Sequence, residues 1–364
     1  MFYTVQCAAD SPRTRWLLTG LARRCEAMGY KRIAAGEAEA ADVRLVFNFI
    51  DPSQPRPYRR RAQATFVVSI AEADPPPANV LYAGYPLLVR SLANLLIYLV
   101  HGRDGIDTYF ITLEQGCYPV PCRPGEDEAY FDALWERIRP LATSNLVIDN
   151  EFHPDLPQAL WEGDEVTERV RWAARKIDEM NLWPAPFPIQ EILPPEDLRH
   201  VKRLYGIGGL SYGNLSARKD GERFWMSASG VNKANLHKIG EDILMVTGFN
   251  PGRRAMRLSV PPHVQPRRVS VDAIEHWMIY REHPQVGAIV HIHAWMEGVQ
   301  STQVNYPCGT VELAKAVAEL VRQADDPARA IIGLKNHGLT ITGPDLDDIF
   351  ERIDGKIIPQ VPMS

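Results

Sequence analysis

Apolar and polar positions follow two different periods along the first part of the chain. Segments 2–8, 43–49 and 65–70 are short runs rich in β-branched and aromatic residues, which is typical of strands. Segment 13–28, which Gly29 closes, instead has the period of about 3.6 residues expected of an amphipathic helix. This alternation predicts a three-layer α/β domain with a mostly parallel sheet. Further helices are expected at 87–100 and 126–141, and further strands at 108–112 and 146–149.

A proline-rich stretch follows a predicted helix at 164–180 and indicates a boundary in the chain. Its prolines are Pro184, Pro186, Pro188, Pro194 and Pro195. Such a stretch cannot be helical throughout, so we expect a linker or a surface segment. The sequence thus predicts an α/β domain of unknown role at 1–184 and a second domain at 185–364.

The second domain is predicted to mix helices and strands. A glycine-rich turn at 206–213 follows its first helix, and Ser270 is a good N-cap for a later one. Helices are expected at 195–205, 270–281, 310–323 and 345–352, and strands at 224–227, 243–247, 254–258, 288–293 and 330–334.

Bulk properties narrow the class of protein. A length of 364 residues with 45% hydrophobic residues suffices for two packed cores. The net charge of −5 argues against a nucleic-acid binder. The one basic cluster, Arg56 with 59–61, is expected to be a solvated loop, with a phosphate or carboxylate contact as the alternative. The apolar helix predicted at 87–100 is too short to cross a bilayer and carries Arg90, and no signal peptide is visible. The five cysteines, odd in number and scattered, indicate reduced intracellular usage; they are Cys7, Cys25, Cys117, Cys122 and Cys308. We expect a cytoplasmic protein with no membrane or nucleic-acid partner.

The clearest chemical signal is a pair of histidines at the end of a buried strand. His291 and His293 point to the same face, because side chains alternate along a strand. A third histidine, His337, stands just before another strand-like run at 339–342. Three neutral imidazoles with one open position form a catalytic divalent-metal site, most often for zinc. The pair alone is a weak signal, and by itself it favours two strand-end histidines that are hydrogen-bonded locally.

Five segments in a fixed order favour the metal site over two locally hydrogen-bonded histidines. They are Gly-Asn-Leu-Ser-Ala-Arg at 213–218, Ser-Ala-Ser-Gly-Val-Asn-Lys at 227–233, the helix at 270–281, the His-x-His strand at 288–293, and Lys-Asn-His-Gly-Leu at 335–339. In this order and spacing they resemble the class II aldolase/adducin family, over about residues 190–350. The resemblance implies an α/β/α domain with a mostly antiparallel central sheet. It also implies one divalent ion on His291, His293 and His337, Zn²⁺ first, with Mn²⁺ or another divalent ion as an alternative.

The resemblance also assigns an acid/base residue. Asp272 occupies the position where family members carry a catalytic carboxylate, which can move a proton on a hydroxycarbonyl substrate. The alternative is an acidic residue in a first helical turn, favoured by the helix dipole. Glu275 lies at the capping-box distance from Asp272 and is interpreted as structural. His276 is interpreted as a packing residue or a neighbour of the ligands.

Family enzymes bind the phosphate of their substrate at positions that correspond here to Gly213, Asn214, Ser229, Gly230 and Ser270. Each could equally be an ordinary turn residue. The sugar-phosphate aldolases usually have a second serine where this chain has Val271, so a carboxylate or a neutral polar group could replace the phosphate. The stretch between His293 and His337 is also shorter than in family aldolases and lacks the region that carries their protonating tyrosine.

These observations favour a metal-dependent carbon–carbon lyase, either an aldolase or a decarboxylase. Its substrate would be a small hydroxycarbonyl compound or hydroxy acid, which reacts through a metal-stabilised enediolate. An epimerase or dehydratase of a sugar phosphate and a non-catalytic, adducin-like scaffold remain alternatives. The family implies a homo-oligomer, commonly a tetramer. The first domain resembles no family, and residues 8–12 lack the glycine-rich turn of a dinucleotide site.

Overall fold

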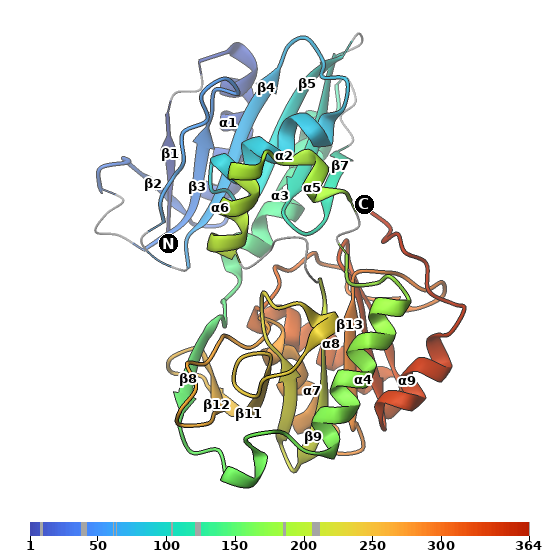
Figure 1. The fold of residues 1–364 in the computed structure, drawn as a ribbon. Coiled ribbons are helices and arrows are strands. Elements are labelled where there is room, and N and C mark those ends of the chain that lie inside the picture. The colour runs from blue at the N-terminus through green and yellow to red at the C-terminus, as the bar shows by residue number, and fades with distance from the viewer. Residues whose placement is uncertain are drawn as a thin grey trace. The chain divides into compact units, whose positions relative to one another are not determined.

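The computed structural model describes residues 1–7, 10–37, 42–60, 62, 64–102, 105–120, 125–184, 187–205 and 212–363, with only the main chain of 202–205. Arg61, Cys122, Pro186 and most of the predicted turn at 206–213 lie outside these ranges. The chain forms two compact units (Figure 1). Unit 1 comprises Met1–Thr143 and Gln190–Leu198, and unit 2 comprises Ser144–Ile189 and Arg199–Met363.

Unit 1 is built on a seven-stranded sheet with the order β2-β1-β3-β4-β5-β6-β7. Neighbours from β2 through β5 are parallel, whereas β6 and β7 are added antiparallel. The predicted, mostly parallel sheet is therefore confirmed. The strands are β1 Phe2–Gln6, β2 Lys31–Ile33, β3 Val43–Phe49, β4 Phe66–Ala73, β5 Leu95–Gly102, β6 Gly105–Thr112 and β7 Gly116–Val120.

Helices cover both faces of this sheet. Thr108 of β6 is hydrogen-bonded to Tyr130 of α3 (Asp127–Thr143) at 2.9 Å. Ile111, on the opposite face of the same strand, packs against Gly84 of α2 (Val80–Arg90). Helix α1 (Pro12–Ala27) lies against α3, where the ring of Phe131 fills the space beside Gly20. Unit 1 thus has the three layers predicted for it.

One predicted helix of unit 1 is wrong. Segment 87–100 is not a single helix: α2 ends at Arg90, Leu92 adopts a φ of 57°, and the remaining apolar residues form β5. Buried helices and buried strands are both apolar throughout, so periodicity cannot separate them. Two short helices, α5 Ile189–Ile192 and α6 Pro195–Tyr205, follow the proline-rich stretch.

Unit 2 contains a nine-stranded sheet with the order β14-β15-β16-β13-β9-β10-β11-β12-β8. Every neighbouring pair is antiparallel except the two outermost, β14–β15 and β12–β8. The predicted, mostly antiparallel sheet is confirmed. The strands are β8 Asp149–His153, β9 Asn214–Asp220, β10 Arg223–Ser227, β11 Ile243–Asn250, β12 Ala255–Ser259, β13 Ala288–Ile292, β14 Gln300–Ser301, β15 Ile331–Leu334 and β16 Gly338–Gly343.

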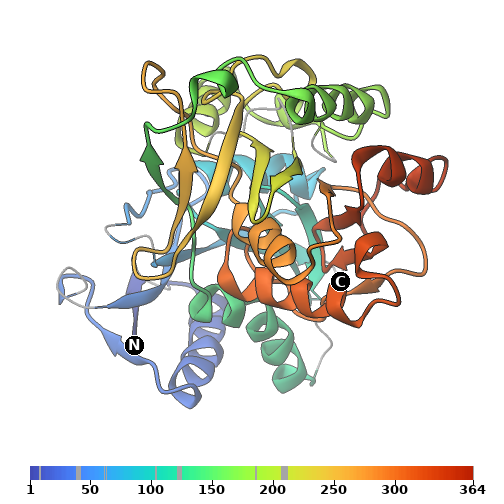
Figure 2. The same ribbon diagram turned by 90° about the horizontal axis from the view of Figure 1, so that it is seen from below.

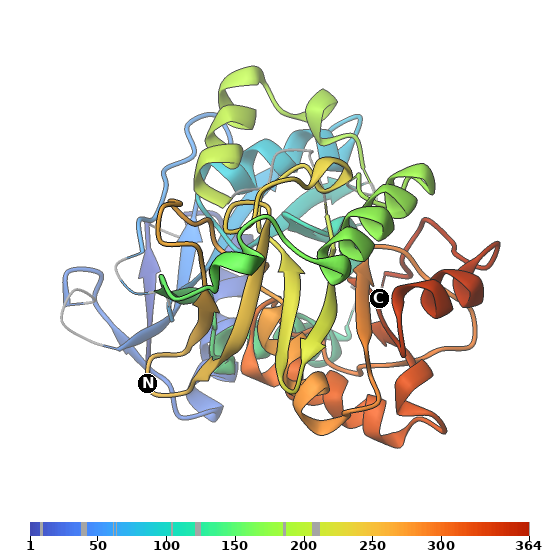
Figure 3. The ribbon, with the colours of Figure 1, turned by 60° about the horizontal axis from the view of Figure 1, so that its bottom comes forward.

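The helices of unit 2 lie in two layers, one on each face of the sheet. Ser216 of β9 faces α7 (Ala273–Glu282), where its hydroxyl is 2.8 Å from that of Tyr280. Trp225 of β10 faces the other way and donates to Asp164, the N-cap of α4 (Glu165–Glu179). Figures 2 and 3 show green α4 and the orange helices on opposite sides of the strands. The remaining helices are α8 Val311–Gln323, α9 Leu346–Ile353 and the 3₁₀ turns η2 Gln158–Leu160, η3 Lys233–Asn235 and η4 Pro327–Arg329.

Two sequence expectations differ from this arrangement. Residues 144–184, which the sequence places in the first domain, lie in unit 2, because β8 pairs with β12 and α4 contacts β9 and β10. These partners are distant in sequence, so local composition gives no sign of them. Ser270 is not the N-cap of α7: Asp272 holds that position, without a side-chain capping bond. In the part of the chain that the structure describes, no helix is both long and apolar enough to cross a membrane.

Candidate metal centre

Two antiparallel strands bring three histidines together. His291 is part of β13, His293 follows that strand, and His337 directly precedes its partner β16. One ring nitrogen from each lies within 4.8 Å of the others, and all three side chains are buried. The Nε2 atoms of His293 and His337 are 3.1 Å apart. The predicted triad is therefore assembled in space.

Glycines let neighbouring backbone approach the histidine strand. A Cβ atom at Gly213, whose φ is 76°, would lie 2.3 Å from the carbonyl oxygen of His291. A Cβ atom at Gly338 would lie 2.2 Å from the carbonyl oxygen of Ile292. Neither contact is possible for any other residue without movement of the main chain. The two glycines thus fix the strand end that presents His291 and His293.

Burial favours the neutral form of His291 and His293, which is the form that binds a metal. Burial lowers the pKa of His291, although the negative charge of Asp272 opposes this effect, and burial lowers the pKa of His293 further. The Nδ1 atom of His291 lies 2.9 Å from the carbonyl oxygen of Leu339 and is assigned as the donor. That bond leaves the His291 Nε2 lone pair available, and this buried atom has no hydrogen-bond partner among the described residues.

The spacing fits a divalent ion. Zinc–nitrogen bonds of about 2.0–2.1 Å at a tetrahedral angle place two ligand nitrogens about 3.3 Å apart. The 3.1 Å between His293 and His337 is close to that value. Among the residues that the structure describes, this is the one cluster of three or more histidine, cysteine or acidic side chains with such spacing.

Asp272 is held by one oxygen and leaves the other unused. The Nδ2 atom of Asn214 donates to Asp272 Oδ2 at 2.7 Å. Asp272 Oδ1 is buried and has no partner within the described ranges. The carboxylate is close enough to His291 for its charge to raise the pKa of that imidazole. Asp272 is therefore positioned and can still accept a proton.

A buried lysine adds positive charge to the same site. Lys233, the first residue of η3, is 3% exposed, and its ammonium lies 5.6 Å from the ring centre of Trp183. Burial lowers the pKa of Lys233 to about 8, and the carboxylate of Asp272 opposes that shift. The charge of Lys233 also lowers the pKa of His291 and His293. An ammonium, a carboxylate and the three imidazoles thus share one electrostatic environment.

Residues 199–305 match the model of the class II aldolase and adducin N-terminal domain. Residues 199–305 belong to the class II aldolase and adducin family. Asp272, His291 and His293 lie inside the matched segment, and His337 follows it. Unit 2 contains the matched segment, and because of that match we use 'class II aldolase domain' below as a label for unit 2.

Several solved structures are similar to part of the chain. YgbL from Escherichia coli, described as a candidate aldolase, epimerase or decarboxylase, is 17% identical over 51% of this chain and 82% of its own, with a TM-score of 0.35. An L-fuculose 1-phosphate aldolase is 17% identical over 53% of this chain and 81% of its own, with a TM-score of 0.37. An aldolase II superfamily protein from Pseudomonas syringae is 16% identical over 52% and 71%, with a TM-score of 0.34. The chain matches no curated protein.

The five residues expected to bind an anion lie on several segments of the class II aldolase domain, and their anion binding stays a prediction. Gly213 allows the close approach described above, and Asn214 holds Asp272. The other three lie on adjacent segments that an isolated bridge between Ala228 and Val269 joins. The main-chain N–H of Ser229 donates to Arg268, that of Ser270 donates to Ser227, and Gly230 has a φ of 69°.

Glu275 does not form the expected capping box with Asp272. Its side chain turns to the sheet and accepts a hydrogen bond from Thr340 Oγ1 at 2.5 Å. Burial, and next the charge of Asp272, raise the pKa of Glu275 to about 8. His276, on the same helix, is 2.7 Å from Ser216 Oγ, and burial lowers its pKa well below the ordinary value. Glu275 and His276 thus join helix α7 to the sheet by hydrogen bonds, which agrees with the structural roles expected for them.

Sequence reasoning gave no role to Lys233 or Cys308. Lys233 stands at the end of the Ser-Gly motif, but its burial beside the Trp183 ring and its interaction with the charge of Asp272 cannot be read from the sequence. Cys308 Sγ lies 3.3 Å from His337 Nε2, a proximity that no spacing along the chain indicates.

Proposed function

We propose that the class II aldolase domain is a divalent-metal-dependent carbon–carbon lyase that acts on a small hydroxy acid or hydroxycarbonyl compound. One observation carries the proposal: three buried imidazoles converge near a positioned carboxylate, one oxygen of which has no hydrogen-bond partner among the described residues. A scaffold protein has no need of that combination, whereas proton transfer next to a polarised oxygen requires it.

His291, His293 and His337 would hold the ion, and zinc is our first choice because three imidazoles and an open position suit it. When bound, such an ion supplies Lewis acidity, which lowers the energy of negative charge that develops on substrate oxygen as the carbon–carbon bond breaks. The Leu339 carbonyl keeps His291 in the required tautomer.

Asp272 would move the proton. Asn214 donates to Oδ2 and so orients the carboxylate, and Oδ1 remains to take a proton from a substrate hydroxyl or to return one to carbon. Its position at the start of α7 keeps it fixed relative to β9, since Asn214 is the first residue of that strand.

Lys233 would bind the substrate carboxylate. Val271 removes one hydroxyl donor that a phosphate would use, while the buried ammonium of Lys233 offers a compact positive charge near Asp272. A buried cation with an acidic partner favours an added anion of single charge over a phosphate dianion. This preference supports a hydroxy-acid substrate, and with it decarboxylation or aldol cleavage of an unphosphorylated compound.

An epimerase or dehydratase of a sugar phosphate is the second candidate, because the same ligands and the same carboxylate would serve it. The reaction products distinguish the lyase from the epimerase or dehydratase. We would load the protein with Zn²⁺ or Mn²⁺ and screen hydroxy acids beside sugar phosphates, following CO₂, aldehyde and ketone release by coupled assays and all products by NMR. Metal-dependent release of a carbon fragment supports the lyase. A rearranged product with an intact carbon skeleton, or a protein without turnover that binds no metal, contradicts it.

We also propose that the protein is a homo-oligomer, with a tetramer as the first expectation by family resemblance. Light scattering at assay concentration should give a multiple of the chain mass. A fully active monomer would contradict this proposal.

A further inference from the structure

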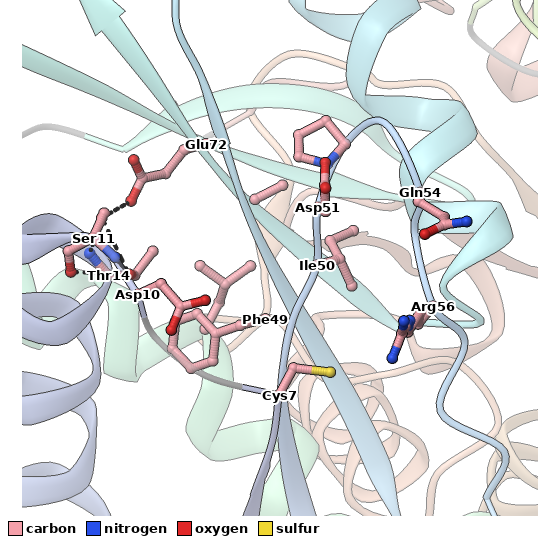
Figure 4. Close-up of a pocket in the computed structure, with 13 residues that line it drawn as sticks. Cys7, Asp10, Ser11, Thr14, Phe49, Ile50, Asp51, Gln54, Arg56 and Glu72 are labelled. Atoms are coloured by element: carbon pink, nitrogen blue, oxygen red, sulfur yellow. Dashed lines mark hydrogen bonds between the residues drawn. The ribbon is translucent and has the colours of Figure 1, made fainter.

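Unit 1 has a cavity of about 440 Å³ at the carboxyl ends of β1, β3 and β4 (Figure 4). Strand β1 lies between β2 and β3 in the sheet. The chain passes from β1 through α1 to β2 at one edge, and then continues with β3 on the opposite flank of β1. Helix α1 contacts α3 on one face, whereas α2 covers the opposite face. The cavity therefore lies at the topological switch point of a doubly wound sheet, where open α/β folds bind their ligands.

The cavity has an apolar floor and a polar rim. Phe49, Ile50, Ile70 and Ala71 are buried and form the floor. Its dimensions are those of a site for a small organic molecule. Around it, the side chains of Asp10, Gln54 and Arg56 are exposed, and within the described ranges no hydrogen bond or ion pair occupies them. The rim thus offers acceptors and donors that no described residue occupies.

An anion is not the expected occupant. The amino end of α1, which in many α/β folds binds phosphate, is already supplied with a carboxylate: Ser11 caps the helix and also donates to Glu72. Asp10 and Asp51 add two more carboxylates, against the single guanidinium of Arg56. Hydrogen bonds from Ser53 hold the pKa of Asp51 below its ordinary value, so this carboxylate stays ionised. Phosphate groups would meet a net negative rim.

A simple cation does not fit either. The three acidic groups of the rim form no cluster with metal-ligand spacing in the described part of the chain, and Arg56 adds a positive charge. A hydroxyl group can donate to a carboxylate and accept from a guanidinium or an amide at once. Carboxylates at strand ends also bind the hydroxyls of ribose in doubly wound folds.

We propose that unit 1 binds a neutral polyhydroxylated compound of sugar or polyol type at this switch point. Asp10 and Asp51 accept from its hydroxyls, Arg56 and Gln54 donate to its oxygens, and Phe49 and Ile50 contact its carbon skeleton. This site is separate from the metal centre and needs none of its residues.

Cys7 supplies a local probe, since it lines the cavity and its thiol is exposed, whereas Cys25 of the same unit is buried. We would treat the full-length protein with iodoacetamide in the presence of neutral aldoses and alditols, ATP, NAD or sugar phosphates, and measure labelling of Cys7 by peptide mass spectrometry. A neutral polyol should slow labelling of Cys7 in the wild type and in H293A alike.

Asp51→Asn should weaken that protection by about tenfold or more, because it removes a charged acceptor. Asp107→Asn, an exposed carboxylate of β6 outside the cavity, is the matched control and should leave protection unchanged. The proposal is overturned if no neutral polyol protects Cys7, if ATP, NAD or a sugar phosphate protects it better, or if Asp51→Asn protects as well as the wild type. Protection of Cys7 is measured in H293A, which lacks a metal ligand. The result for the polyol site therefore does not depend on whether the lyase proposal holds.

Discussion

The two units place polar groups at strand ends in opposite ways. In the class II aldolase domain the histidines, Asp272 and Lys233 are buried, and close backbone contacts at Gly213 and Gly338 fix the strand end that presents His291 and His293. In unit 1 the polar rim at the switch point is exposed, and the side chains of Arg56 and Asp10 have no hydrogen-bond or ion-pair partner within the described ranges. Residues packed around a buried site must have particular sizes and polar groups, whereas an open site needs only side chains that can contact the ligand. The first therefore leaves a motif in the sequence and the second does not.

The largest expected effect tests whether Asp272 acts as the acid/base. Asp272→Asn keeps the size of the side chain and can still accept from Asn214, but it cannot take a proton at neutral pH. Turnover should fall by about 10²- to 10⁴-fold, while bound metal is retained. Steady-state kinetics with elemental analysis checks both. If Asp272→Asn turned over normally while Glu275→Gln was inactive, the acid/base would be Glu275.

The next effect concerns Lys233. Lys233→Met keeps the buried stem but removes the charge, so KM for a carboxylate substrate should rise by about 10- to 100-fold, the loss of a charge-assisted hydrogen bond. Lys238→Met is the control, because Lys238 lies on the same segment but is exposed and paired with Glu241. An equal KM in both variants would exclude Lys233 from substrate binding.

A smaller effect is expected for the close backbone contact of Gly213 at the buried strand end. Gly213→Ala places a Cβ atom 2.3 Å from the His291 carbonyl oxygen and also strains the backbone at a φ of 76°. We expect a loss of about 2–4 kcal/mol in the free energy of unfolding. Gly221→Ala, at a φ of 48° with nothing within 4 Å, should lose only about 1 kcal/mol. Equal losses in urea unfolding would mean that the close approach at Gly213 is not needed.

The smallest effect is the pH dependence that Glu275 contributes. Burial raises its pKa from 4.5 to about 8 in the folded protein, so the folded state keeps a proton that the unfolded state has lost. This stability is complete below about pH 4.5 and is lost as the pH rises towards 8. Glu275→Gln mimics the protonated form, so its stability relative to the wild type should rise from about pH 5 to about pH 8. Urea midpoints measured with a chelator in both proteins test this; a constant difference would contradict it.

Much of the class II aldolase domain was predictable, because its signals are local. The apolar run before His291 and the alternation of side chains place two imidazoles on one face, and the motif order indicates the third. Residues whose role depends on distant partners were not predictable. Glu275 meets Thr340 instead of capping its own helix, and the pairing of β8 with β12 moved the domain boundary. In unit 1 the layers followed from periodicity, but the switch-point cavity depends on strand order.

The central claim is that the three histidines hold one divalent ion, and metal content measures it directly. Wild-type protein and His293→Ala, purified without added metal and then exposed to equal Zn²⁺ and desalted, should be compared by elemental analysis. The account predicts one ion per chain in the wild type and almost none in His293→Ala, with both proteins folded by circular dichroism. Full metal content in folded His293→Ala, or a wild type that retains no metal, would contradict it.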